Sequence, residues 1–349
     1  MQRWMRAALG AVGVHSLMAD GAQNQTHDIE RWKKAVIHLE CATDSLSPEQ
    51  RARYMNQLRE QFEKGEIDRD EFIERSGLGS RDIRAWGTAI FLAHSGVRYL
   101  VTARHVLWDK TAAERQAAQL DIRNPVFRRL VESRIFNLIL RVRSLDEVLG
   151  KDPATLPLEF LMNLSAGHPD MVPYIFSNPD IDLAVINLDH GEKRFADGLE
   201  QAGYAPVTFE DVADGPSSEG DPIFSVGFPA ATALLGELPL FGGLRNWSSS
   251  YVSLPVFSYG HVGMLHAGLP SFWADISIWP GNSGGPIIGD KKIVGIVSSQ
   301  ATIPIEPGSY GQQASEQRIR ILFARAIKPR PVREMIAVLE DRMRAFPRS

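Results

Sequence analysis

The chain has 349 residues, of which 44% are hydrophobic and 23% charged, a balance typical of globular proteins that excludes wholesale disorder. Its 42 acidic and 38 basic residues give a net charge of −4, whereas a nucleic-acid-binding protein usually has a basic excess. The single cysteine, Cys41, excludes an intrachain disulfide and metal sites of the CxxC type.

Residues 1–30 show no clear periodicity, and we expect them to form an N-terminal tail. The longest apolar run there, Ala7–Val14, is too short to span a bilayer. Two arginines precede this run, so export through a weak signal is the alternative to a cytoplasmic location; His15 and the weak hydrophobicity favour the cytoplasm. The uncharged stretch 246–274 is broken by Ser, Gly and Pro, and we expect no membrane span.

A strand and a helical hairpin are predicted for 31–83. Val36–Cys41 alternates between apolar and other residues, as a strand does. Ser47 and the proline that follows it are typical of a helix start, and the helical spacing ends at Gly65. A second short helix is predicted over Arg69–Arg75.

The face of the first helix carries Tyr54, Leu58 and Phe62. The hairpin weakly resembles the small SHOCT-type helical hairpin, which implies self-association or docking of a regulatory partner through 47–77. We predict that this segment packs near a barrel surface and that the three side chains serve as the interaction site if they are exposed; a purely structural helical decoration is the alternative.

From Gly87 onward the pattern changes to short β-rich segments, and such a series predicts an antiparallel sandwich or barrel. Between them, 110–150 is charged and is predicted as a helical insertion, and Pro331 opens a last amphipathic helix. The predicted strands are Thr88–Ala93, Arg98–Thr102, Asp182–Leu188, Ile223–Gly227, Tyr251–Ser258, Phe272–Ile278, Lys292–Ser299 and Arg318–Ala324.

The string GNSGGP at 281–286 is the most informative motif. A turn so rich in glycine can hold Ser283 at a tight bend with neighbouring N–H groups directed into one small concavity, as an oxyanion hole requires. The same string fits the nucleophile elbow of α/β-hydrolases, but those enzymes place their histidine after the serine. Here the last histidine is His266, so the elbow is excluded and the base must precede Ser283.

His105 follows directly on a predicted strand, which would place it at a barrel edge, whereas His38 lies inside a strand and is predicted to be structural. Asp182 stands at the start of the apolar strand Leu183–Ile186, and Asp180 is predicted to be a solvated loop charge. The resulting order is histidine, aspartate, serine.

Three strings now resemble, in this order, the trypsin/chymotrypsin-fold serine proteases: TARHV at 102–106, DLAVI at 182–186 and GNSGGP. Within that family they are most similar to bacterial trypsin-like peptidases of the high-temperature-requirement type. The resemblance covers 84–190 and 220–328, with 31–42 as a first strand.

The resemblance implies roles for individual residues. Ser283 would be the nucleophile and His105 the general base, while Asp182 would orient the imidazole and stabilise its protonated form. The N–H groups of Gly281 and Ser283 would form the oxyanion hole.

The resemblance also implies how a substrate is held. Ser298, Ser299 and Gln300 would pair antiparallel with the substrate backbone. Ser277, six residues before the nucleophile, would lie near the base of the specificity pocket, and its lack of charge favours a small or medium apolar residue before the cleaved bond.

Two departures from the family bear on regulation. Asn282 stands where the digestive enzymes have a carboxylate for N-terminal ion pairing, so activation of that kind is not expected. We expect no PDZ-like domain in the 66 residues after Ser283. Arg104 replaces the small residue common before the histidine, and the sequence does not explain it.

The predicted fold is therefore all-β, with two six-stranded antiparallel barrels, peripheral helical insertions and a C-terminal helix. The predicted division is 1–30 tail, 31–83 first strand and hairpin, 84–190 N-terminal barrel, 191–330 C-terminal barrel and 331–349 helix. The predicted function is a serine endopeptidase acting on a protein or peptide, and the alternative is a catalytically silent protease-fold binding module. No cofactor or metal is expected, since the EF-hand-like loop at 60–71 has Phe and Lys where calcium needs oxygen ligands.

Overall fold

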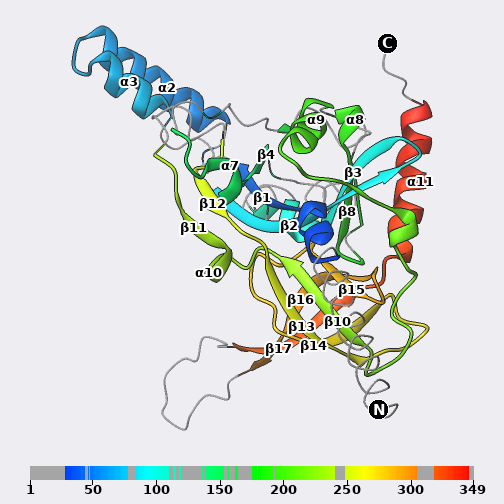
Figure 1. Cartoon of the computed structure of the whole chain (residues 1–349). Coiled ribbons are helices and arrows are strands. Elements are labelled where there is room, and N and C mark those ends of the chain that lie inside the picture. The colour runs from blue at the N-terminus through cyan, green and yellow to red at the C-terminus, as the bar shows by residue number, and fades with distance from the viewer. Residues whose placement is uncertain are drawn as a thin grey trace, which may run out of the picture.

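The computed structural model describes most of the chain between residues 28 and 345 and is mostly β, with minor helices (Figure 1). The described residues are 28–43, 48–77, 83–109, 138–152, 175–178, 180–191, 193–239, 248–304 and 318–345, with short stretches at 46, 113–114, 118, 136, 156 and 162–163. The predictions for the N-terminal tail therefore lie almost wholly outside the described residues.

The second half of the chain forms a closed six-stranded antiparallel barrel, in the order β10-β13-β14-β17-β16-β15. Its core is built from alternate residues of neighbouring strands, including Phe272, Ala274, Ala324 and Ala326. Gly295 lies where a Cβ would come within 2.7 Å of the Phe272 ring, so the large ring fits only because this residue is glycine. The strands are β10 (Pro222–Gly227), β13 (Val256–Met264), β14 (Ser271–Ile276), β15 (Pro286–Gly289), β16 (Lys292–Pro304) and β17 (Arg318–Ile327).

The first half forms an eight-stranded sheet with the order β6-β4-β1-β2-β3-β8-β7, in which β9 also pairs with β2. The described strands thus confirm one closed barrel, and the pairing that would close a second one stays a prediction. The strands are β1 (Val36–Thr43), β2 (Ile83–His94), β3 (Val97–Ala103), β4 (Leu138–Arg141), β6 (Met162–Asn163), β7 (Ile175–Asn178), β8 (Leu183–Asn187) and β9 (Val207–Thr208).

The single strand predicted over Tyr251–Ser258 is wrong, because two strands occupy this region. β12 (Tyr251–Ser253) belongs to a small three-stranded sheet with β11 (Leu234–Glu237) and β5 (Arg143–Ser144), and β13 belongs to the barrel. Between them stands Pro255, which has no N–H to donate to a ladder, so the chain changes sheets there.

The helical insertion predicted for 110–150 is wrong over 138–144, whereas the described residues 113–114, 118 and 145–148 are helical. Leu138–Arg141 forms β4 and pairs with β1, and only the single turn α7 (Leu145–Val148) is helical among 138–148. A short apolar run such as Leu138–Leu140 has no period that separates strand from helix, and pairing with β1 decides for the strand. Most of 110–137 lies outside the described residues.

The predicted helical hairpin is present as α2 (Pro48–Glu63) and α3 (Arg69–Gly77), but it extends away from the barrel (Figure 1). The apolar face of α2 packs in part against α3. The Tyr54 hydroxyl donates to the Arg75 carbonyl at 3.0 Å, and the ring centroids of Phe62 and Phe72 lie 5.0 Å apart. Leu58 on the same face is 1% exposed. The three side chains therefore do not form one exposed patch, because Leu58 is buried and Tyr54 is half-buried against α3, while Phe62 is 40% exposed.

The last helix, α11 (Arg330–Ala345), confirms its predicted apolar face, on which Met335, Ile336 and Leu339 are buried. It follows the barrel in sequence but packs against β7 and β8 of the first half. No described helix is long and apolar enough to cross a membrane.

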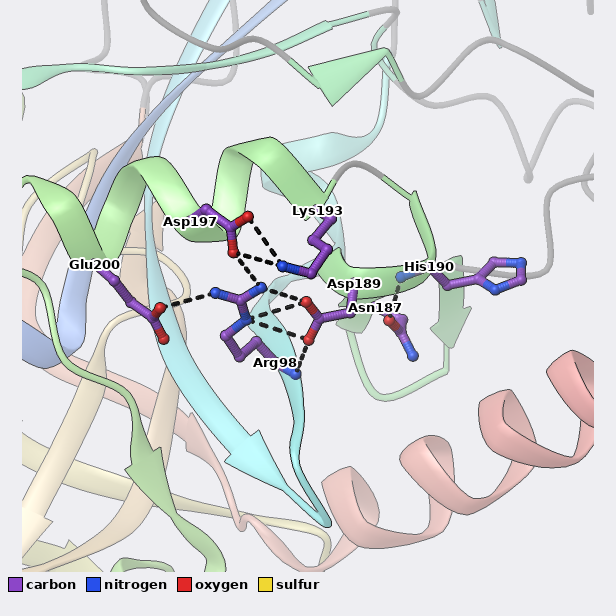
Figure 2. A network of polar contacts seen from close by, with 7 residues as sticks. All are labelled: Arg98, Asn187, Asp189, His190, Lys193, Asp197 and Glu200. Carbon is purple, nitrogen blue, oxygen red and sulfur yellow. Dashed lines mark hydrogen bonds and ion pairs between the residues drawn. The ribbon is translucent and has the colours of Figure 1, made fainter. Parts of the chain in front are cut away.

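An ionic network joins the far ends of β3 and β8 to the helices α8 (Leu188–Gly191) and α9 (Lys193–Gln201) (Figure 2). The Arg98 guanidinium binds the carboxylates of Asp189, Asp197 and Glu200, and the Arg98 N–H also donates to Asp189 at 2.7 Å. The side chains of Arg98 and Asp189 are 12% and 22% exposed, so solvent screens this pair less than the pairs that Arg98 makes with the more exposed Asp197 and Glu200. The opposite ends of the same two strands carry the predicted histidine and aspartate.

Replacing Arg98 should therefore destabilise the first half measurably. In Arg98→Met, the partly buried Asp189 loses its cation and most of its hydrogen bonds, and we expect the free energy of unfolding to fall by about 1–3 kcal/mol in urea titrations. Arg344→Met is the matched control, since the Arg344 side chain is 75% exposed and makes pairs only within α11. It should change stability by less than about 0.5 kcal/mol, and equal losses in the two variants would contradict the role given to the network.

Candidate active site

His105 is held outward by a one-turn helix whose neighbouring side chains are buried. α4 (Arg104–Leu107) follows β3 directly, and Val106 and Leu107 point into the core while His105 is exposed. Gly87 makes room for this turn, since a Cβ there would lie 2.4 Å from a Val106 methyl. The imidazole is therefore presented to solvent from a rigid base.

Asp182 meets this histidine because β3 and β8 are antiparallel neighbours, with Ala103 opposite Leu183. One carboxylate oxygen of Asp182 accepts the backbone N–H of His105 at 2.9 Å, and the other lies 2.8 Å from His105 Nδ1. That second oxygen also accepts the Ser298 hydroxyl at 2.7 Å. Asp182 has a positive φ of 58°, which aspartate tolerates better than most residues.

These contacts fix both the charge of the carboxylate and the tautomer of the ring. Burial raises the pKa of Asp182, but the hydrogen bonds from His105 and Ser298 outweigh it, and the pKa lies below its usual value. An ionised carboxylate only accepts hydrogen bonds, so Nδ1 of His105 carries the proton and Nε2 keeps its lone pair in the neutral ring.

Three further residues that the sequence analysis considered have other surroundings. Asp180 is exposed, and its N–H is capped by Asn178. The His38 ring is buried and stacks on Phe228 at 4.6 Å, and burial lowers its pKa to about 3, so it stays neutral. The Arg104 guanidinium lies over the Trp108 ring at 5.2 Å, which accounts for this residue beside the histidine.

The glycine-rich loop at 281–285 is pinned to both halves of the molecule. On the barrel side, Gly284 N–H donates to Val297 and Val297 N–H donates to Gly285, at 2.7 and 2.9 Å. Gly284 has a φ of 86°, and a Cβ on it would lie 2.1 Å from the Thr88 carbonyl oxygen. The close approach of β2 to the loop thus requires glycine, and it leaves the Ser283 side chain half-exposed.

Two amides of this loop are oriented by the carbonyls that precede them. The Pro280 carbonyl accepts the N–H of Ala230 at 2.8 Å, and the Asn282 carbonyl accepts the N–H of Gly285 at 2.9 Å. In a trans peptide the next N–H points the opposite way, so the N–H groups of Gly281 and Ser283 are directed away from these partners. Neither donates to a backbone carbonyl in the described part of the chain, which leaves two donors, two residues apart, available for an anionic oxygen.

Thr88, on β2, connects the two halves at this loop and was missed by sequence reasoning. Its N–H donates to the Ser283 carbonyl at 2.8 Å and its hydroxyl donates to the Gly281 carbonyl at 2.8 Å. The same hydroxyl accepts the N–H of Phe228 at 3.1 Å, and the Thr88 carbonyl accepts the hydroxyl of Thr102 at 2.7 Å. Because Gly281, one of its partners in the loop, is 193 residues away, no local pattern could have indicated it.

The four predicted substrate-binding residues lie in two places. Ser277 is half-buried and follows β14 directly. On β16, Ser298 is buried with its hydroxyl on Asp182, Ser299 is exposed, and Gln300 is half-buried with a side-chain oxygen that has no hydrogen-bond partner.

Comparison with known families agrees with this arrangement. A model of the trypsin-like peptidase domain matches residues 87–296, more than half of the chain, and the chain therefore belongs to this family. The membership supports a serine protease. No curated protein matches the chain.

Thr88 should act as a positioning residue, since it holds the loop by both its backbone and its hydroxyl. In Thr88→Val the Gly281 carbonyl and the Phe228 N–H lose their partner, and we expect kcat for peptide hydrolysis to fall about 10- to 100-fold with little change in KM. Thr88→Ser keeps the hydroxyl and should restore most of kcat. Equal losses in both variants, or a loss in KM alone, would contradict this role.

Proposed function

We propose that the chain is a serine endopeptidase that works through His105, Asp182 and Ser283. The observation that carries the proposal is the 2.8 Å contact between His105 Nδ1 and an Asp182 carboxylate that also accepts the His105 N–H. It leaves the lone pair of Nε2 to act as a base. The serine loop is tied to Val297, next to the Ser298 that donates to Asp182, in a chain of the trypsin-like peptidase family.

In the first half of the reaction, Ser283 Oγ attacks the carbonyl carbon of the scissile bond and passes its proton to His105 Nε2. The N–H groups of Gly281 and Ser283 stabilise the negative oxygen that forms. The C–N bond then breaks, and the leaving amine takes the proton from His105, which leaves an acyl ester on Ser283.

In the second half, His105 takes a proton from water while the water oxygen attacks the ester. The bond to Ser283 Oγ breaks, the serine regains its proton from His105, and the acid product leaves. Through both halves Asp182 stays ionised and stabilises the imidazolium, as its lowered pKa requires.

Ser298–Gln300 and Ser277 are proposed to bind the residues before the cleaved bond. The uncharged Ser277 favours a small or medium apolar residue there. The strings TARHV, DLAVI and GNSGGP further support a place near the bacterial high-temperature-requirement type. Self-association or docking of a partner through 47–77 stays a proposal, and of the three side chains Tyr54, Leu58 and Phe62 it has Phe62 alone as an exposed one.

A fluorophosphonate probe tests the function against a silent binding module of the same fold. The probe should label the wild type and fail to label Ser283→Ala, because only an activated serine reacts. Thermal melting should be unchanged in this variant, since the backbone carbonyl held by Thr88 remains. Ser217→Ala, at an exposed serine outside the site, should label normally; an unlabelled wild type would favour the silent module.

Asp182→Asn tests the histidine–aspartate contact. An amide in this place can donate to Nδ1 and so favours the wrong tautomer, and we expect kcat to fall by about 10⁴. Peptide hydrolysis by purified protein measures this directly, and near-normal turnover would mean that Asp182 has no role in catalysis.

A further inference from the structure

β16 extends past the barrel, and there one of its edges has no partner strand among the described residues. β15 pairs with it only as far as Ile296, and Val297 is bound by the loop residues Gly284 and Gly285. From Ser298 to Pro304, β17 is the only described strand that pairs with it. A row of backbone N–H and C=O groups on the other edge is therefore open to an incoming strand.

The part of β16 that extends past the barrel also has exposed apolar side chains. We define the arm as residues 301–304 of β16 and 318–322 of β17, which continue beyond the residues of β17 that pair with β14 (Figure 1). Ile303 and Ile319 are direct cross-strand partners and are 51% and 55% exposed, so their side chains share one face. Leu322 and Phe323, which lie in a bulge of β17, are 54% and 40% exposed.

The open edge begins at the candidate site. Ser298, its first residue, donates its hydroxyl to Asp182, and the strand then continues into the arm. A peptide that pairs antiparallel with Ser298–Gln300 must therefore continue along 301–304 with the residues on the N-terminal side of its cleaved bond.

We propose that this arm binds the part of the substrate N-terminal to the cleaved bond and selects apolar side chains there. Paired strands advance one residue for one residue, so if the residue before the bond lies opposite Ser298, about the sixth residue lies opposite Ile303. The proposal rests on the proposed function and adds apolar subsites at about the fifth and sixth positions before the bond.

The substrate is the occupant that fits this edge best. A second copy of the chain paired along 298–304 would cover Ser298–Gln300, which the proposed reaction needs for its substrate. A substrate strand would bind the backbone groups of the edge and the apolar side chains of the arm at the same time. One ligand would thus account for both exposed features.

A peptide series tests the proposal. All peptides keep the same three residues before a chromogenic leaving group; one set ends there, and two longer sets add three residues that are either leucine and valine or serine. For the wild type we expect kcat/KM of the apolar six-residue peptide to exceed that of the short peptide and of the serine peptide by about tenfold.

The arm variants Ile303→Asp and Ile319→Ser should remove this gain and leave the short peptide unaffected. Leu269→Asp, at an exposed leucine in the β13–β14 turn, is the matched control and should keep the gain. Ile319→Ser introduces no charge, so it shows whether the effect of Ile303→Asp comes from unfolding of the arm by the new carboxylate. Melting curves check the stability of both variants.

Equal rates for all three peptides, or a gain that survives both arm variants, would overturn the proposal while hydrolysis of the short peptide still supports the proposed function. A change in oligomeric state in these variants, with the gain retained, would assign the arm to contacts between copies and also overturn it. Absence of both hydrolysis and probe labelling would instead refute the proposed function, and this inference with it.

Discussion

The Asp182 carboxylate is the point on which the site depends. It accepts hydrogen bonds from the backbone and ring of His105 in the first half and from Ser298 in the barrel, so one side chain joins the two halves where they meet. These bonds also keep its pKa low in spite of burial, and an ionised group in this position is costly to leave unpaired. The relative position of β3, β8 and β16 is therefore under strong restraint at this point.

A second restraint acts on the serine loop from the other side. Thr88 uses its N–H, hydroxyl and carbonyl together, and the loop approaches β2 closely enough that Gly284 admits no side chain. The amide groups of Gly281 and Ser283 are thus set before any ligand arrives, which lowers the reorganisation that an oxyanion would otherwise require. The hydrogen bonds to Asp182 thus fix the charge of its carboxylate, and the hydrogen bonds of Thr88 fix the position of the serine loop.

The sequence was informative wherever the determinant is local. The strands around His105 and Asp182 alternate or are wholly apolar, and the glycines around Ser283 mark a turn, so these elements and their order could be predicted. The break at Pro255 and the strand at Leu138–Arg141 could not, because sheet membership depends on a partner strand far along the chain. The same holds for Thr88 and for the hydroxyl of Ser298, whose bond to Asp182 joins residues far apart in the chain. The face of Tyr54 and Leu58 was found correctly as apolar, but periodicity does not say which element covers it.

The position of α11 has a consequence for the order in which the protein matures. This helix is made after every strand that it covers, yet it packs on β7 and β8, and Glu340 on it receives the hydroxyl of Tyr99 from β3. A nascent chain on the ribosome therefore cannot complete the packing around β7 and β8 until α11 has emerged. The strand that follows Asp182 gains this outer cover only after the whole barrel has been synthesised.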